Sequence, residues 1–498
     1  RGRWVAVMGK KKKAAKSVRW AAASGFASGE SDRVARPQDS WAAKPDNSLA
    51  PFVHPLAVQE GAEGKGKAPE AGRASALDER EEKLARRAEK LGYSKATTSE
   101  RHPLSAAIRG LAYEEWMLEC QQAQAFKSFE KTPFTYVDTE EKLAQLAAKL
   151  DGEGVIAVDL ENHSLHSYQG FLCLMQISTR TEDFIVDSLA LRERIGPALG
   201  HIFADAAKVK VMHGATSDIV WLQRCHGIYL ANLFDTGQAA RVLALPSFGL
   251  AYLLLHYCNY KTNKTYQMAD WRQRPLPQHL VTYARADTHF LLYMYDRLRI
   301  DLQSRTSVPD QLQVELPASP HPQGPMGTVL QRSASISLQM YQKPVFTETT
   351  YLDYYSKQRG ATFTPKQLAV FAGLYAWRDA EARRLDESPE AVLAKSQLMD
   401  LARGSGASAD STQVTVKKIC NRKQNPARAC QEELCRVIES AVEQEISYGS
   451  PMKKKTAGNS NASGAAVEPK GKKDKEKTVK KKSKKKKAPV RNRPSASG

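Results

Sequence analysis

The sequence predicts an α/β fold with a mixed sheet, followed by a small all-α domain. Between residues 132 and 305, short apolar segments rich in β-branched and aromatic residues alternate with segments of helical periodicity. The first apolar segments follow one another closely, which favours a sheet with both parallel and antiparallel strands. After residue 362 the pattern is helical only.

The α/β region opens with a strand and then a helix, for which Asp138 or Thr139 is the expected N-cap and Glu141 lies in the first turn. Strand patterns and helix patterns then alternate to the end of the region. Strands are predicted over residues 155–161, 171–179, 183–188, 208–214 and 229–235, and helices over 217–224, 237–244, 250–258 and 277–302.

The helical region is predicted to be a small bundle. Leu368, Phe371 and Leu374 fall on one face of its first helix. Thr364 is the expected N-cap of that helix, with Pro365 at the first helical position. The closing helix is expected over residues 427–446.

Composition divides the chain into six regions. Few aliphatic residues predict disorder at the N-terminus, and lysine-rich low complexity predicts it at the C-terminus. The regions are a disordered N-terminal region (1–100), an N-terminal arm (101–131), the α/β domain (132–305), a linker rich in Pro, Ser and Gln (306–361), the helical domain (362–447) and a Lys-rich tail (448–498).

The positive charge is concentrated in the tail. Of the formal net charge of +20, residues 451–498 contribute +14, from 17 Lys or Arg and 3 Asp or Glu. Such a tail suits contact with nucleic-acid phosphates without sequence preference, or a nuclear localisation signal; a solubilising tail without a partner is the alternative. Seven cysteines show neither CxxC pairs nor zinc spacing, which favours reduced thiols, and no apolar run reaches transmembrane length, so no membrane partner is expected.

Four acidic residues and one tyrosine carry the functional signal. Asp159 and Glu161 are two apart near the end of a predicted strand, so their side chains share one face, at the edge where α/β sheets bind ligands. Tyr283 and Asp287 are four apart on a predicted helix and also share a face. Asp218 begins a helix after HGATS.

Each motif alone has a structural alternative. The strand pair can cap a strand end or form salt bridges, the helical pair can be a core tyrosine beside a surface aspartate, and Asp218 can interact favourably with a helix dipole. Together they favour metal chemistry. Unpaired carboxylates are costly in apolar segments unless a cation neutralises them, and paired Mg²⁺ ions commonly cleave phosphodiesters.

These segments resemble the DEDD exonuclease superfamily, in the tyrosine subclass that includes ribonuclease D. The resemblance is closest to the RNase D-like catalytic subunit of the eukaryotic nuclear exosome, and it covers residues 100–305. It continues into a helicase-and-RNase-D C-terminal (HRDC) domain, where AWRDAEARRLDES matches. The matching catalytic segments are residues 158–192, 213–236, 265–276 and 283–298.

The resemblance implies an RNase H-like fold and a 3′→5′ exoribonuclease that releases nucleoside 5′-monophosphates. Two Mg²⁺ ions, replaceable by Mn²⁺, would be held by the four carboxylates, and Tyr283 would position the attacking water. Three further residues are candidates to contact the substrate, and each has an alternative: a local cap for His163, core packing for Trp221 and a solvated side chain for Lys264.

The same resemblance implies single-stranded RNA 3′ ends as substrate, nuclear exosome core subunits as partners, and a nuclear, nucleolar location. The expected roles are the processing of ribosomal and small nucleolar RNA, and RNA surveillance and decay. The family's N-terminal module that binds a small cofactor protein is not recognisable in residues 1–100. The alternatives are a stand-alone RNase D-like enzyme for tRNA 3′ ends and a catalytically silent RNA-binding scaffold.

Overall fold

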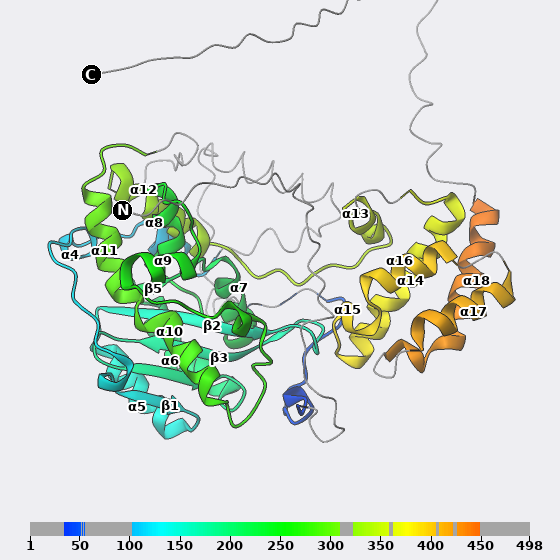
Figure 1. The fold of residues 1–498 in the computed structure, drawn as a ribbon, viewed down its shortest axis with the longest axis horizontal. Helices are drawn as coiled ribbons and strands as arrows, with labels where there is room; N and C mark the ends of the chain where they lie inside the picture. The colour runs from blue at the N-terminus through cyan, green and yellow to red at the C-terminus, as the bar shows by residue number, and fades with distance from the viewer. Residues whose placement is uncertain are drawn as a thin grey trace, which may run out of the picture. The chain divides into compact units, whose positions relative to one another are not determined.

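The structure is a computed structural model that describes residues 34–50, 52, 54, 102–308, 322–357, 362–404, 408–421 and 426–448 (Figure 1). The predicted Lys-rich tail lies outside these residues beyond Tyr448. Within the described ranges, no helix has both the length and the apolar character that crossing a membrane requires.

A six-stranded mixed sheet forms the centre of the α/β domain, as the sequence predicts. The strands lie in the order β1-β4-β3-β2-β5-β6. Strand β2 pairs antiparallel with β3 and parallel with β5, and β5 pairs parallel with β6. The strands are β1 (Phe134–Val137), β2 (Val155–His163), β3 (Phe171–Ser178), β4 (Asp183–Asp187), β5 (Val209–Met212) and β6 (Leu233–Asp235).

Helices cover both faces of the sheet, as Figure 1 shows. One face packs against α5, α6 and α7, and the other against α8 to α11. Thr139 is the N-cap of α5, one of the two predicted candidates. The helices are α3 (Ser105–Arg109), α4 (Glu115–Leu118), α5 (Glu140–Asp151), α6 (Arg192–Ala204), α7 (Thr216–His226), α8 (Thr236–Val242), α9 (Leu250–Cys258), α10 (Gln278–His289) and α11 (Leu291–Gln303).

The residues that alternate along β2 decide which face carries the site. Ile156 and Val158 belong to the core under α5, α6 and α7, whereas Ala157 belongs to the core on the opposite side. Because side chains alternate along a strand, Asp159 and Glu161 lie on the same face as Ala157. This is the face that α10 and α11 cover.

Two segments differ from their sequence-based predictions. The single helix expected over 277–302 is divided at Phe290, whose buried ring packs against Phe126 and Phe129. The expected linker contains helices α12 (Gly324–Ser337) and α13 (Thr350–Ser356). Helix α12 forms because Val329 and Leu330 are buried in the core of the α/β domain. This packing outweighs the polar composition of the segment.

The N-terminal region also departs from the predicted disorder, between residues 34 and 50. Trp41 packs edge-on against Phe171, with ring centroids 5.1 Å apart. Arg36 forms an ion pair with Glu387 of the helical domain. Composition predicts disorder because the region is poor in aliphatic residues, but one aromatic side chain and one arginine hold this part against the folded domains.

The helical domain has its own hydrophobic core. Thr364 caps its first helix as predicted, and Gln367 completes a capping box. Phe371 and Leu374 are fully buried in that core. The helices are α14 (Pro365–Leu385), α15 (Pro389–Val392), α16 (Lys395–Gly404), α17 (Ala409–Cys420) and α18 (Gln431–Tyr448).

Candidate active site

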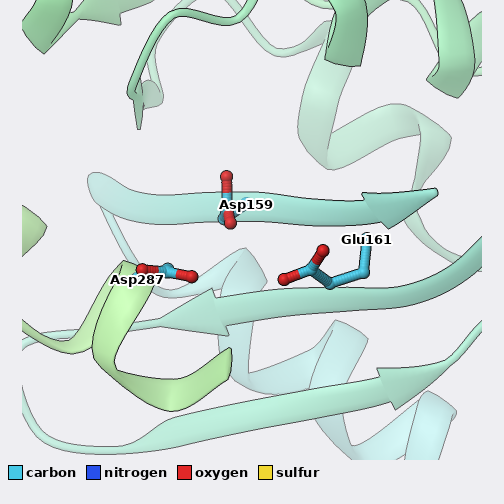
Figure 2. Close-up of side chains that lie close together, drawn as sticks. All are labelled: Asp159, Glu161 and Asp287. Atoms are coloured by element: carbon cyan, nitrogen blue, oxygen red, sulfur yellow. The ribbon is translucent and has the colours of Figure 1, made fainter. Parts of the chain in front are cut away.

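Three of the predicted carboxylates meet on the face of β2 that α10 covers. One carboxylate oxygen from each of Asp159, Glu161 and Asp287 lies within 4.8 Å of the others. Figure 2 shows Asp159 and Glu161 on β2, with the side chains of Glu161 and of Asp287 on α10 extending toward each other. A single oxygen-rich site therefore combines a strand motif with a helix motif more than 120 residues away.

Asp218 approaches the same cluster from α7. It lies in the first turn of this helix and is buried. The negative charge of Asp159 raises the pKa of Asp218, and the negative charge of Asp218 raises the pKa of Glu161. Asp235, at the end of β6, anchors the start of α7 because its Oδ2 accepts a hydrogen bond of 2.8 Å from the Ala215 backbone.

The cluster is electrostatically strained when it holds no cation. Burial raises the pKa of Asp159 to about 7. Burial, followed by repulsion from neighbouring carboxylates, raises the pKa values of Glu161, Asp218 and Asp287 well above their usual range. Among the described residues, no Lys or Arg forms an ion pair within 4.0 Å of any of the four carboxylates. Their negative charge therefore favours a bound cation.

The donor set fits a hard divalent cation. All of its side-chain ligands are carboxylate oxygens, which Mg²⁺ and Mn²⁺ prefer, and no thiolate or imidazole belongs to the group. Oxygens within 4.8 Å of one another are close enough for one cation, with metal–oxygen distances of about 2.1 Å, to draw them into a shared coordination shell. For the site to hold two ions, the fourth carboxylate, that of Asp218, is needed as well.

Tyr283 lies one helical turn before Asp287 and is buried beside the carboxylates. Burial raises the pKa of its hydroxyl, and the charges of Asp287 and Glu161 raise it further. The phenol therefore keeps its proton near neutral pH. In this state it can donate a hydrogen bond to a water molecule or phosphate oxygen, but it is a poor base.

The three candidate substrate contacts have different surroundings. The His163 Nε2 accepts a 3.0 Å hydrogen bond from the His166 backbone, which is the local cap considered as its alternative. Trp221 packs against the core under α7, as its alternative supposed. Lys264 is exposed at the start of a 3₁₀ helix (Lys264–Met268). A substrate role for each of them stays a prediction.

Sequence reasoning missed Gln176, which the structure places beside the cluster. This residue of β3 is the cross-strand partner of Asp159. Its side chain is fully buried, and neither of its polar atoms has a hydrogen-bond partner among the described residues. A buried amide without a partner indicates an unseen water or ligand atom. The only sequence signal is one polar residue within an apolar strand.

Comparisons with known proteins agree with this geometry. The 3′-5′ exonuclease family matches residues 134–303, and the HRDC domain family matches residues 367–438. Both matches coincide with the two regions that the structure builds as an α/β domain and a helical domain.

Three similar proteins illustrate the relationship. The chain is 49% identical to "Protein RRP6-like 2" of Arabidopsis thaliana over 55% of its length, and 44% identical to "Exosome complex component 10" of Homo sapiens over 60%. The matches cover only 30% and 32% of those proteins, so the chain corresponds to about a third of each. The crystal structure of the catalytic core of RRP6 from Trypanosoma brucei superimposes with a TM-score of 0.64 at 34% identity, covering 82% of this chain and 99% of that one.

Proposed function

Because this chain belongs to the RRP6 family and carries that family's 3′-5′ exonuclease and HRDC domains, we propose that it is a 3′→5′ exoribonuclease. Its proposed reaction is hydrolysis of RNA from the 3′ end, one nucleoside 5′-monophosphate at a time. The observation that carries the proposal is the convergence of Asp159, Glu161 and Asp287 within 4.8 Å, with no described Lys or Arg side chain paired to them.

Four carboxylates are proposed to hold the metal: Asp159, Glu161, Asp218 and Asp287. Two bound Mg²⁺ ions would supply Lewis-acid stabilisation of the scissile phosphate and of the leaving 3′ oxygen. Mn²⁺ has the same ligand preference and is expected to replace Mg²⁺. The oxygen-only ligand set supports this assignment.

Tyr283 is proposed to orient the attacking water. Its hydroxyl faces Asp287, and its raised pKa keeps it protonated, so it would act as a hydrogen-bond donor that fixes the water or a phosphate oxygen. Glu161, which belongs to the same group of carboxylates, is proposed to assist that water. His163 and Trp221 remain candidates for holding the terminal nucleotide, and Lys264 for contacting a phosphate.

The relatives support a cellular setting for this activity. One is named as an exosome component, and another as an RRP6-like protein. We extend the proposal to association with the nuclear exosome, with ribosomal and small nucleolar RNA processing and RNA surveillance as its tasks. Co-purification of exosome core subunits with the tagged chain tests this part, and their absence would favour the stand-alone enzyme.

A degradation time course tests the activity itself. Single-stranded RNA carrying a 5′ label should shorten to a ladder from its 3′ end with Mg²⁺, and remain intact with EDTA or with Asp287→Asn. The matched control is Asp151→Asn, which changes an aspartate whose side chain is 55% exposed on α5. Intact RNA with the unaltered protein and Mg²⁺, despite RNA binding, would favour the scaffold alternative.

A further inference from the structure

A basic and aromatic surface lies near Asp235, at the end of β6. It consists of Arg241 on α8, Phe248 in the loop between α8 and α9, and Arg332 on α12, and we call these three residues the basic ledge. Helices α8 and α12 lie side by side in Figure 1 and are in contact. The segment predicted to be a linker therefore returns to the α/β domain and supplies one of the two arginines.

A chain of hydrogen bonds joins the ledge to the helix that carries Asp218. The Ala215 backbone, three residues before Asp218, donates to Asp235 Oδ2 at 2.8 Å, and the Gln238 backbone donates to Asp235 Oδ1 at 3.0 Å. Arg332 Nε then donates to the side-chain oxygen of Gln238 at 2.8 Å. The chain thus connects Arg332 to the start of the helix that carries Asp218, at the edge where the parallel strands β2, β5 and β6 end.

The charge of the two ledge arginines is not balanced by an ion pair with any carboxylate that the structure describes. Within the part of the chain that the structure describes, no carboxylate lies within 4.0 Å of either guanidinium. By contrast, Arg274 and Arg285 each form a short ion pair. Burial and the proximity of Arg241 lower the pKa of Arg332, and only Asp235, already bonded to two backbone amides, opposes this. An incoming anion would relieve the repulsion between the arginines.

Phe248 gives the ledge a second kind of contact. Its side chain is 37% exposed, although large aromatic rings are usually covered. The Arg241 guanidinium carbon lies 4.7 Å from the ring centroid, which holds the ring and the cation together on one surface. An exposed ring beside unpaired arginines is the combination on which proteins stack bases and neutralise phosphates of single strands.

We propose that the basic ledge binds single-stranded RNA on the 5′ side of the scissile phosphate, with Phe248 stacking on a base and the two arginines contacting phosphates. The inference rests on the proposed function, because the strand's 3′ end must occupy the acidic cluster. The remainder of the strand then has to leave a strongly negative site. A neighbouring surface with unpaired positive charge at the same sheet edge compensates the approach of further phosphates.

Comparing a long RNA with a short one distinguishes a defect in the ledge from a defect in the catalytic groups. Wild type, Phe248→Ala and Arg332→Gln should be compared on 5′-labelled RNA of 20 nucleotides and on a trinucleotide, which offers the ledge fewer bases and phosphates. We expect kcat/KM on the long RNA to fall roughly tenfold with Phe248→Ala, which is the effect of losing one stacked base. The trinucleotide rate should fall less than the long-RNA rate in both variants.

Salt dependence identifies the charged contact. The slope of log kcat/KM against log salt on the long RNA should become shallower by about 0.7 with Arg332→Gln, and Arg332→Lys should restore it. The matched control is Arg194→Gln, which removes an arginine 63% exposed on α6 and should change neither value. Thermal unfolding of each variant confirms that it is folded.

The outcomes are distinct. Equal losses on both substrates, or no loss on either, would overturn the ledge as an RNA-binding surface. An unchanged long-RNA slope in Arg332→Gln would do the same and would leave an acidic protein partner as the remaining occupant. Failure of the unaltered protein to cleave either RNA would instead refute the proposed function.

Discussion

Helix α10 presents two pairs of polar side chains, and they meet buried acids in opposite ways. Tyr283 and Asp287 face the carboxylate cluster, where negative charges gather without a cation. Two positions further along, Arg285 donates to Asp183 at 2.8 Å, and His289 lies 2.9 Å from the same carboxylate. One helix thus borders two kinds of site. In the strained group, the carboxylate cluster, the negative charges repel one another; in the compensated group, the charge of Asp183 is balanced by Arg285 and His289.

The pKa values of the two groups record the difference. Burial raises the pKa of Asp183, but hydrogen bonds from His289, Ser178 and Arg285 outweigh it and leave the pKa below its usual value. At Asp287, burial and the charge of Asp159 both act upward. Buried aspartates of similar exposure therefore differ in whether their neighbours stabilise the charged form, and those whose pKa is raised beside other carboxylates are functional-site candidates.

The largest expected effect is the loss of catalysis in the strained group. Asp159→Asn should lower the cleavage rate by roughly a thousandfold or more, because metal binding contributes several kcal/mol to transition-state stabilisation. Single-turnover rates on 5′-labelled RNA measure this. The metal-free variant should be at least as stable as wild type, since it has lost a repelled charge. Substantial cleavage by Asp159→Asn would contradict the claim that the carboxylates of the cluster are needed for catalysis.

The compensated group should respond in the opposite way. Asp183→Asn removes the partner of Arg285 and His289 and leaves buried positive charge, so the free energy of unfolding should fall by about 3 kcal/mol. Urea titration measures the change, and the folded fraction should still bind metal. A stable variant that has lost metal binding would place Asp183 in the site and remove the distinction.

Replacing Tyr283 tests the side of α10 that faces the cluster. This replacement leaves the charge of the cluster unchanged. Tyr283→Phe should slow hydrolysis by about a hundredfold, because the hydroxyl that orients the water is lost. Metal affinity should be retained, since the phenol is protonated and is not a proposed ligand. Calorimetry and single-turnover kinetics separate the two effects. A parallel loss of metal affinity would instead assign the tyrosine to the metal site.

The smallest expected effect is a dependence of stability on pH. In EDTA, the raised pKa of Asp159, about 7, lies above the value near 4 of an unfolded carboxylate. At this residue the folded protein then binds more protons than the unfolded chain between these values, so the contribution of Asp159 to the free energy of unfolding falls as pH rises through this window. Asp159→Asn should flatten the decline in urea titrations at pH 5, 6 and 7.

The compensated acids change the free energy of unfolding with pH in the opposite direction. The pKa values of Asp183 and Asp187 are lowered in the fold, because partners outweigh burial at both residues. Their stabilisation is present above the unfolded value near 4 and is lost as pH falls through their folded pKa values. An equal pH dependence of wild type and Asp159→Asn in EDTA would contradict the assignment of strain to the cluster, because His102, His163 and His226, whose pKa values burial lowers, act with the opposite sign and contribute alike to both proteins.

The sequence predicted the mixed sheet and most of its elements because apolar periodicity depends on local pattern. It could not predict helix α12, whose residues are polar in composition and become helical only when Val329 and Leu330 meet the α/β core. The packing of residues 34–50 could not be predicted for a similar reason, since Trp41 contacts Phe171 only in the folded domain. In both segments tertiary packing outweighs local preference.

For the site, the sequence indicated the acids but could not show which of them lacked partners. Asp183 and Asp287 both lie in apolar segments, and only the structure shows that one meets Arg285 while the other meets carboxylates. Gln176 shows the same limit, because its position opposite Asp159 depends on strand register. Charge compensation is a property of contacts between distant segments, which periodicity does not report.

Calorimetric titration of Mn²⁺ into the metal-free protein at pH 7 tests the central claim most directly. Repeating it in buffers of different ionisation enthalpy counts the protons that binding displaces. The strained cluster predicts two bound ions with proton release, because the carboxylate pKa values are raised, and loss of at least one ion in Asp287→Asn. Binding that is absent, or unchanged in Asp287→Asn, would contradict the claim that these carboxylates form the metal site.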